Sequence, residues 1–421
     1  NARCTVQSEL GKIPQIPNSP YAHLASGVPT SPLDGMAETS REREGILARP
    51  ATLPDDLLLE ILARVPYRSL CRFRCVSPSW RALCSERGIL RRSPQALSGF
   101  FCYTDDDLWD ARFLNFPGGS GGRRPLVDPS LPFLRGAGYV HDFVLVDCCG
   151  GLLLCKFFTS PTPSSQLDND YVVYNPATEE WTVLPRNEGL DPRNVIRLGF
   201  DPAAPSWFAV FVLLQDLDND CELTGVEIYS SRTGLWTSRQ TAGWSQQGTA
   251  LEYHQDSVSV FLDGSLHLAT DRSSIITVDM DGESLREFRR PYSGPGYIGQ
   301  SQGRLHAIQI VQRNDDDDDD CCLLMVWVLQ DYATGHWNLK HAANILELLG
   351  RQICKQVEEV YTLIAIHPER DLIFFIDEVE ERLMSYDIDS QKLHVVYNKG
   401  EYYLLPYHPY TPCFAEWLPT R

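Results

Sequence analysis

The chain has 421 residues and a formal net charge of −19 at pH 7, with 43% hydrophobic and 22% charged residues. This length and composition indicate a folded protein of two or more structural units and exclude a chain that is disordered throughout. The charge argues against nucleic acid as the main partner, and no apolar run approaches the roughly 20 residues of a membrane span, so neither partner is expected.

Residues 1–50 are predicted to be a disordered extension, because the first 35 are rich in Pro, Ser and Gly and show no periodicity. Met36 is a candidate native start, since it leads into the first structured segment. The chain shows no basic-then-apolar leader and no Asn-x-Ser/Thr sequon, so a cytosolic or nuclear location is expected.

The 13 cysteines are odd in number and dispersed. Such a set is typical of buried thiols rather than of a disulfide framework. No Cys-x-x-Cys pair occurs, and six consecutive aspartates at 315–320 lack the alternation and glycine of a calcium loop. We therefore predict no metal site and no cofactor.

Residues 52–90 show a helical pattern of three short helices. Thr52 is placed to cap the first helix, which ends at Pro66, while Ser77 and Pro78 supply the cap and first turn of the third. The apolar side chains at helical spacing are Leu57, Leu58, Ile61, Leu62, Val65, Leu70, Trp80 and Leu83. Three short helices bury too little apolar surface to be stable alone, so the leucine stripe predicts a partner.

The same segment is basic although the rest of the chain is acidic. Between residues 64 and 92 only Glu86 opposes eight arginines, at positions 64, 68, 72, 74, 81, 87, 91 and 92. A solvated helical face explains this pattern, and an acidic protein partner explains it more specifically.

From residue 97 onward the pattern changes to short β-type runs separated by turn residues. A motif with Thr three residues before Trp recurs, with leucine in the Trp position of two degenerate copies. The pairs are Thr178 and Trp181, Thr233 and Trp236, and Thr334 and Trp337. In the two degenerate copies, Leu285 and Leu393 take the position of the Trp. Successive Trp or Leu positions are 49 to 56 residues apart, close to the roughly 50 residues of a kelch-type propeller blade.

Five copies predict five blades, and the two ends of the β region supply a sixth. We expect a strand near 414–418 to pair with one near 100–103 and close the ring. The predicted propeller covers residues 96–421, has about six blades within a range of five to eight, and carries a helical insertion near 342–360.

Residues 53–66 read LPDDLLLEILARVP and precede Leu70, Arg72, Arg74, Val76 and Trp80. Residues 51–92 thereby resemble an F-box, with a departure at Ser77-Pro78, and the β region resembles the F-box-associated propeller of plant F-box proteins. The resemblance implies an α+β multidomain fold, a small three-helix F-box followed by an all-β propeller.

The resemblance also implies a function. The protein is expected to be a non-catalytic substrate-recognition subunit of a Skp-cullin-F-box (SCF) ubiquitin ligase, whose F-box binds a Skp-family adaptor, and through it a cullin, while the propeller binds a target protein. The implied adaptor-binding residues are Leu53, Pro54, Leu57, Leu58, Ile61, Leu62, Val65, Pro66, Leu70, Trp80 and Leu83.

Two alternatives stay open. A propeller scaffold outside any ligase would cover the leucine stripe within its own fold. A propeller enzyme is less favoured, because His267, His306 and His367 lie near predicted strands but no Gly-x-Ser-x-Gly elbow, His-Glu-x-x-His helix or P-loop occurs.

Overall fold

The computed structural model describes residues 53–417 with gaps, the longest at 117–126, 132–142, 159–168, 240–258 and 352–360. Contacts within the chain divide it into Asn1–Thr52 and Leu53–Arg421. The predicted N-terminal extension and the predicted capping residue Thr52 lie outside the described residues.

A helical module opens the described part of the chain. Its helices are α1 (Asp55–Leu62) and α3 (Pro78–Leu83), with a short helical segment that includes residues 69, 70 and 73 between them. The Trp80 amide donates to Ser77 Oγ at 3.2 Å, and Pro78 occupies the first turn of α3, as the sequence predicts. At α1 the N-cap position is held by Pro54 without a side-chain hydrogen bond.

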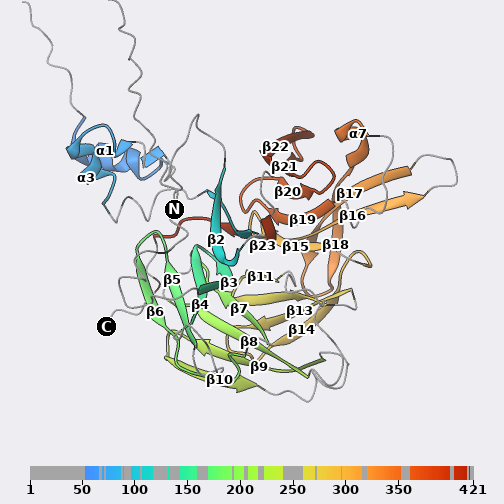
Figure 1. Ribbon diagram of the computed structural model, residues 1–421, viewed down its shortest axis with the longest axis horizontal. Coiled ribbons are helices and arrows are strands. Elements are labelled where there is room, and N and C mark those ends of the chain that lie inside the picture. The colour runs from blue at the N-terminus through green and yellow to red at the C-terminus, as the bar shows by residue number, and fades with distance from the viewer. Residues whose placement is uncertain are drawn as a thin grey trace, which may run out of the picture. The chain divides into compact units, whose positions relative to one another are not determined.

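The β region forms six antiparallel sheets, the blades of a six-bladed propeller (Figure 1). Blade 1 comprises β23 (Tyr403–Tyr410), β1 (Gly99–Thr104) and β2 (Asp107–Asn115). Blade 2 comprises β3 (Phe143–Cys149), β4 (Leu152–Phe158), β5 (Asn169–Asn175) and β6 (Glu180–Val183). Blade 3 comprises β7 (Val195–Gly199), β8 (Ala209–Asp216), β9 (Glu222–Ser230) and β10 (Leu235–Arg239).

The blades 4 to 6 follow the same plan. Blade 4 comprises β11 (Ser259–Leu262), β12 (Ser265–Ala269), β13 (Ser274–Asp279) and β14 (Leu285–Arg289). Blade 5 comprises β15 (Tyr297–Ser301), β16 (Arg304–Asn314), β17 (Asp320–Asp331) and β18 (His336–Asn344). Blade 6 comprises β19 (Tyr361–Ile366), β20 (Leu372–Asp377), β21 (Arg382–Asp387) and β22 (Lys392–Asn398).

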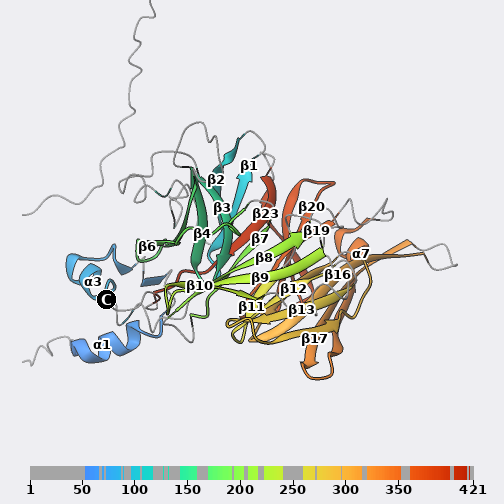
Figure 2. The same cartoon turned by 90° about the horizontal axis from the view of Figure 1, so that it is seen from below.

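The first strand of each blade contacts the first strand of the next, in the order β3, β7, β11, β15, β19, β23 and back to β3. The ring is therefore closed, and its closure is the pairing of β23 with β1, which Figure 2 shows side by side. The predicted closing strand near 414–418 is wrong. Trp417 is instead buried in the apolar cluster between blades 2 and 3, while Gly99 pairs with Tyr410.

Apolar side chains fill the spaces between neighbouring blades. Each of the six junctions, including the one between blades 6 and 1, has its own cluster of buried residues. Since every blade is covered on both faces, the sheets need no helical layer to bury their apolar surface.

The described part of the predicted helical insertion is helical only in part. Residues 342–344 continue strand β18, and the helix α7 covers only Ile345–Leu349. Gly350 ends it in the left-handed conformation, with φ of 67°. The remainder of the predicted helix, residues 352–360, lies outside the described residues.

Candidate functional site

The first helix of the module has one side that packs inward and one that does not. Leu58, Leu59 and Leu62 contact the module's own apolar cluster. By contrast Leu57 is 54% exposed and Ile61 is 50% exposed. Residues four apart lie on the same side of a helix, so these two side chains form one exposed row.

Leu53, just before the helix, is also exposed, to 48%. We call Leu53, Leu57 and Ile61 the apolar stripe. Three large apolar side chains left about half exposed, two on one helix and one just before it, are typical of a surface that binds another protein. In the described residues, no segment of the chain covers the stripe.

Two of the predicted adaptor-binding residues do not belong to this surface. Leu62 is 1% exposed and Leu70 is fully buried, and together with Cys84 and Ile89 they form the core of the module. The reason is helical geometry: Leu62 is rotated about 100° from Ile61, which turns it from solvent to the inside. These two residues stabilise the module and are not placed to contact a partner.

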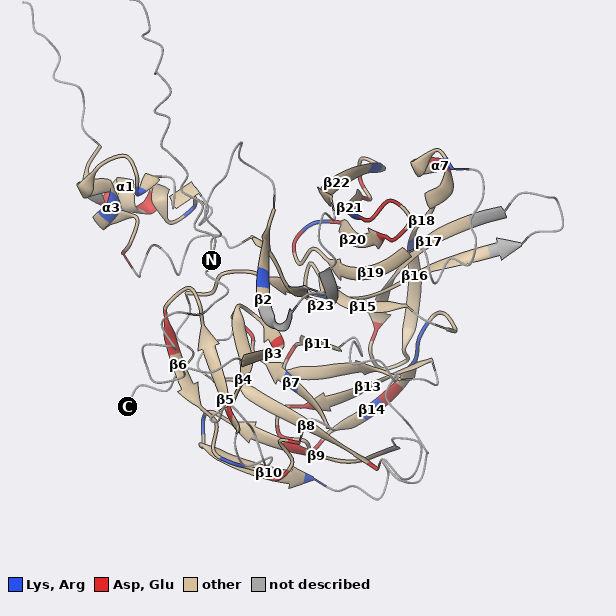
Figure 3. Ribbon diagram, viewed as in Figure 1, with Lys and Arg blue, Asp and Glu red and all other residues tan. Residues whose placement is uncertain are grey.

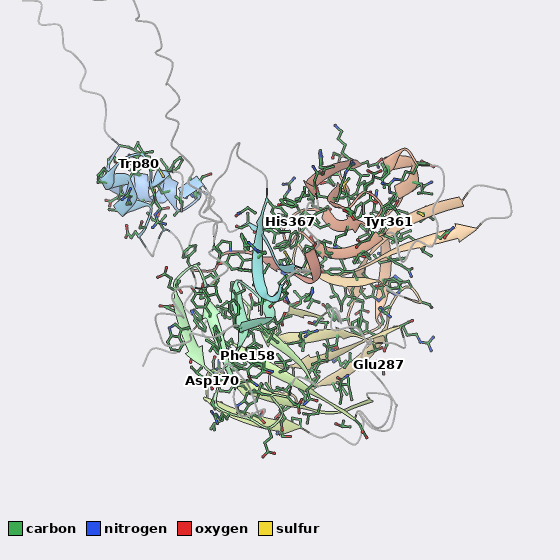
Figure 4. All side chains as sticks on the ribbon, viewed as in Figure 1. Trp80, Phe158, Asp170, Glu287, Tyr361 and His367 are labelled. Carbon is green, nitrogen blue, oxygen red and sulfur yellow. The ribbon has the colours of Figure 1, made fainter. Side chains whose placement is uncertain are left out.

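The other predicted residues lie between these extremes. Pro54 is exposed, whereas Leu58, Val65, Trp80 and Leu83 are half-buried against the module core. Trp80, labelled in Figure 4, meets the Phe73 ring edge-on, with ring centroids 5.5 Å apart. The predicted residue Pro66 lies outside the described residues.

The prediction omitted Val76, which is 65% exposed in the turn before α3. Val76 is among the residues that resemble an F-box, but it lies between Cys75 and Ser77, where the helical period is interrupted, so the apolar spacing did not place it with the stripe. An exposed apolar residue there is a further candidate for partner contact.

Arginines lie close to the apolar stripe along the sequence. Arg64 and Arg81 are exposed, and Arg64 is 3.7 Å from the half-exposed Glu60, a weak surface pair. Arg74 is half-buried, and the predicted basic residues 68, 72, 87, 91 and 92 lie outside the residues whose side chains are described.

The recurring tryptophans join neighbouring blades. Trp181, Trp236 and Trp337 each lie on the fourth strand of a blade and pack against the cluster shared with the preceding blade. The indole nitrogens of Trp236 and Trp337 donate, each at 3.0 Å, to the carbonyl oxygens of Pro185 and Arg289 in the preceding blades.

The threonines of the motif satisfy polar groups of the turn that leads into the same strand. Thr178 Oγ1 donates to Glu180 at 3.1 Å, Thr233 Oγ1 to the Ser230 carbonyl at 3.5 Å, and Thr334 Oγ1 to Asp331 at 2.7 Å. The motif is thus a blade-building element.

The histidines that suggested an enzyme, His267, His306 and His367, are buried in their blades. Burial lowers the pKa of His267 to about 4, and its Nδ1 lies 3.1 Å from the Ser265 carbonyl oxygen. Burial also lowers the pKa of His306, and that of His367 to about 4, with Arg370 nearby as a second cause. Neutral, buried imidazoles held by backbone groups of their own hairpins are a typical structural use of histidine.

Within the described residues, no group of three or more His, Cys, Asp or Glu side chains is arranged to hold a metal ion. None of the described helices has both the length and the apolar character needed to span a membrane.

Comparison with known families agrees with the two parts seen in the structure. The F-box domain matches residues 51–92, and the family described as F-box protein At3g26010-like, beta-propeller, matches residues 132–404, which is more than half of the chain. This chain belongs to that family. The resemblance drawn from the sequence is confirmed, and the helical module is an F-box.

Similar F-box proteins occur in Arabidopsis thaliana. F-box protein At5g07610 is 28% identical over 297 residues, covering 64% of this chain and 68% of the relative. Putative F-box protein At3g16210 is 26% identical over 229 residues, covering 53% and 55%. Putative F-box/kelch-repeat protein At1g15680 is 24% identical over 377 residues, covering 82% and 83%.

Proposed function

We propose that this F-box protein is the substrate-recognition subunit of an SCF-type ubiquitin ligase. The observation that carries the proposal is the exposed apolar stripe on the F-box. Its F-box binds a Skp-family adaptor, which connects it to a cullin, and its propeller binds the protein to be modified. The chain performs no chemistry itself, and its contribution is to hold the target near the conjugating enzyme.

The stripe is large enough to matter for binding. Fully burying one leucine or isoleucine side chain contributes roughly 1.5–3 kcal/mol, so covering the exposed half of each contributes about 1 kcal/mol. The three residues together then supply about 3 kcal/mol, or two orders of magnitude in the dissociation constant.

Aspartate substitutions at the stripe test adaptor binding. Leu57→Asp with Ile61→Asp should abolish capture of the full chain by a Skp-family adaptor, because two carboxylates would have to be buried without partners. The monomer should keep its fold, since both positions are about half exposed in it.

A matched control changes the same kinds of side chain elsewhere. Leu235 and Val379, on the propeller, are 64% and 61% exposed. Leu235→Asp with Val379→Asp should leave adaptor capture intact. Undiminished capture of the Leu57→Asp, Ile61→Asp variant would refute the proposal.

A cytosolic or nuclear location accompanies the proposal, and a fluorescent fusion of the full chain would test it.

A further inference from the structure

Lysine is rare in this chain although basic residues are not. Of 37 basic residues, six are lysine and 31 are arginine. The lysines are at positions 12, 156, 340, 355, 392 and 399. Residues 13–155, which contain the whole F-box, hold 15 arginines and no lysine. In Figure 3, every blue residue of the F-box is therefore an arginine.

The distinction has a chemical consequence in a ubiquitin ligase. In the transfer step a neutral lysine Nζ attacks the carbonyl carbon of the thioester between ubiquitin and the conjugating enzyme. The new C–N bond replaces the C–S bond, the cysteine leaves as thiolate, and the amine proton passes to a base. The arginine guanidinium has a pKa above 12 and stays protonated, so it keeps the positive charge without offering a nucleophile.

The described lysines of the propeller differ in their availability. Lys340 Nζ is 2.6 Å from Asp371, and its side chain is 26% exposed. Lys156 is half-buried with its ammonium 5.5 Å from the centre of the Phe158 ring, and burial lowers its pKa. Lys392, at the start of β22, is exposed. Lys392 is thus the most accessible amine among them.

We propose that the F-box region is built without acceptor amines so that the ligase does not modify its own receptor there, and that Lys392 is the main self-modification site among the described lysines. This inference rests on the proposed function. Arginine supplies the positive charge expected to face an acidic adaptor, and the absence of lysine from residues 13–155 leaves no side-chain amine within the F-box itself.

Restoring amines to the F-box tests the first half. Arg64 and Arg81 are exposed, and lysine keeps their charge. In a ligase reconstituted with full-length chain, adaptor, cullin and conjugating enzyme, Arg64→Lys with Arg81→Lys should raise self-ubiquitination about threefold or more, because tethered amines react at high effective concentration. Mass spectrometry should find the ubiquitin remnant at both positions.

The control is Arg64→Gln with Arg81→Gln, which changes the same sites without adding amines. Measured per captured adaptor, its self-ubiquitination should not rise above that of the unaltered chain, because glutamine adds no amine. An assembled Arg64→Lys, Arg81→Lys complex with no remnant at either position would overturn the inference, as would an equal increase in the glutamine variant.

The second half is tested on the unaltered chain. Among Lys156, Lys340 and Lys392, most remnants should lie on Lys392, and Lys392→Arg should lower self-ubiquitination. Remnants mainly on Lys156 or Lys340 would overturn the assignment. Adaptor capture is measured first for every variant: its absence in the unaltered chain refutes the proposed function, whereas capture without the expected remnants refutes this inference alone.

Discussion

A buried ion pair joins the end of blade 5 to blade 6. Arg351 follows α7, and its guanidinium donates to both carboxylate oxygens of Asp377, at 3.0 and 2.7 Å, and to the Tyr361 hydroxyl at 3.2 Å. The side chain of Asp377 is 1% exposed and that of Arg351 is 19% exposed. The bonds to Asp377 raise the pKa of Arg351 above its usual value. Tyr361 is labelled in Figure 4.

Removing the arginine should be costly. Arg351→Ala leaves the Asp377 carboxylate buried, with the Val379 amide, 3.3 Å away, as a remaining donor. Breaking a buried pair in this way costs about 3–5 kcal/mol, and we expect about 3 because Arg351 is partly exposed. Removing both charges should cost much less, since Arg351→Met with Asp377→Leu leaves no unpaired charge behind.

A nearby exposed pair provides the control. Arg382 is 3.2 Å from Glu380, and the two side chains are 42% and 46% exposed. Arg382→Ala should cost no more than about 1 kcal/mol. Urea denaturation of each full-length variant, followed by circular dichroism, gives the comparison. If Arg351→Ala lowers the midpoint no more than Arg382→Ala, the argument from burial is wrong.

Two further predictions concern the propeller. Trp417 is fully buried, and its indole nitrogen donates to Glu180 at 3.2 Å. Trp417→Ala should therefore lower the unfolding free energy by about 3–5 kcal/mol in denaturant titrations. As a control, Leu339→Ala, at a 52% exposed position, should change it by less than about 0.5 kcal/mol. Burial lowers the pKa of His267, His367 and His408 to about 4, from an unfolded value near 6.5. As the pH falls from 6.5 towards 4, the unfolded chain takes up these protons first, so the stability present above pH 6.5 is lost by up to about 1.4 kcal/mol per pH unit for each histidine. His267→Gln should reduce that slope, whereas His394→Gln, at an exposed position, should leave it unchanged.

The repeat could be predicted from the sequence because its signal is local. Each Trp motif joins the third strand of a blade to the fourth through a four-residue turn, as between β5 and β6 or β9 and β10. Tight turns with glycine at positive φ, such as Gly264 and Gly303 at 73° and 68°, join first and second strands. Features confined to one turn repeat visibly, so five copies predicted five blades, and joining the two ends of the β region added a sixth within a range of five to eight.

The strand that closes the ring was not predicted because its own residues do not have the pattern of a strand. β23 contains Pro406 and Pro409, and proline is disfavoured within a β-strand. In the described sheet, β23 is the innermost strand of blade 1 and pairs only with β1. The backbone N–H groups on its other edge make no hydrogen bonds to a neighbouring strand of that sheet, so proline, which lacks an N–H, is tolerated there. The segment left after the last repeat copy was predicted to be the closing strand instead, but its Trp417 fills a space between blades that the sequence does not reveal.

The candidate site was predicted only in part, for a related reason. Helical spacing identifies every apolar position of α1, but it does not say which part of a broad apolar surface the short module uses for its own core. Leu58 and Leu62 pack against that core, and Leu57 and Ile61, one position before each, remain exposed. A one-residue offset therefore separates a residue that stabilises the F-box from one that is available to a partner, and only coordinates resolve that offset.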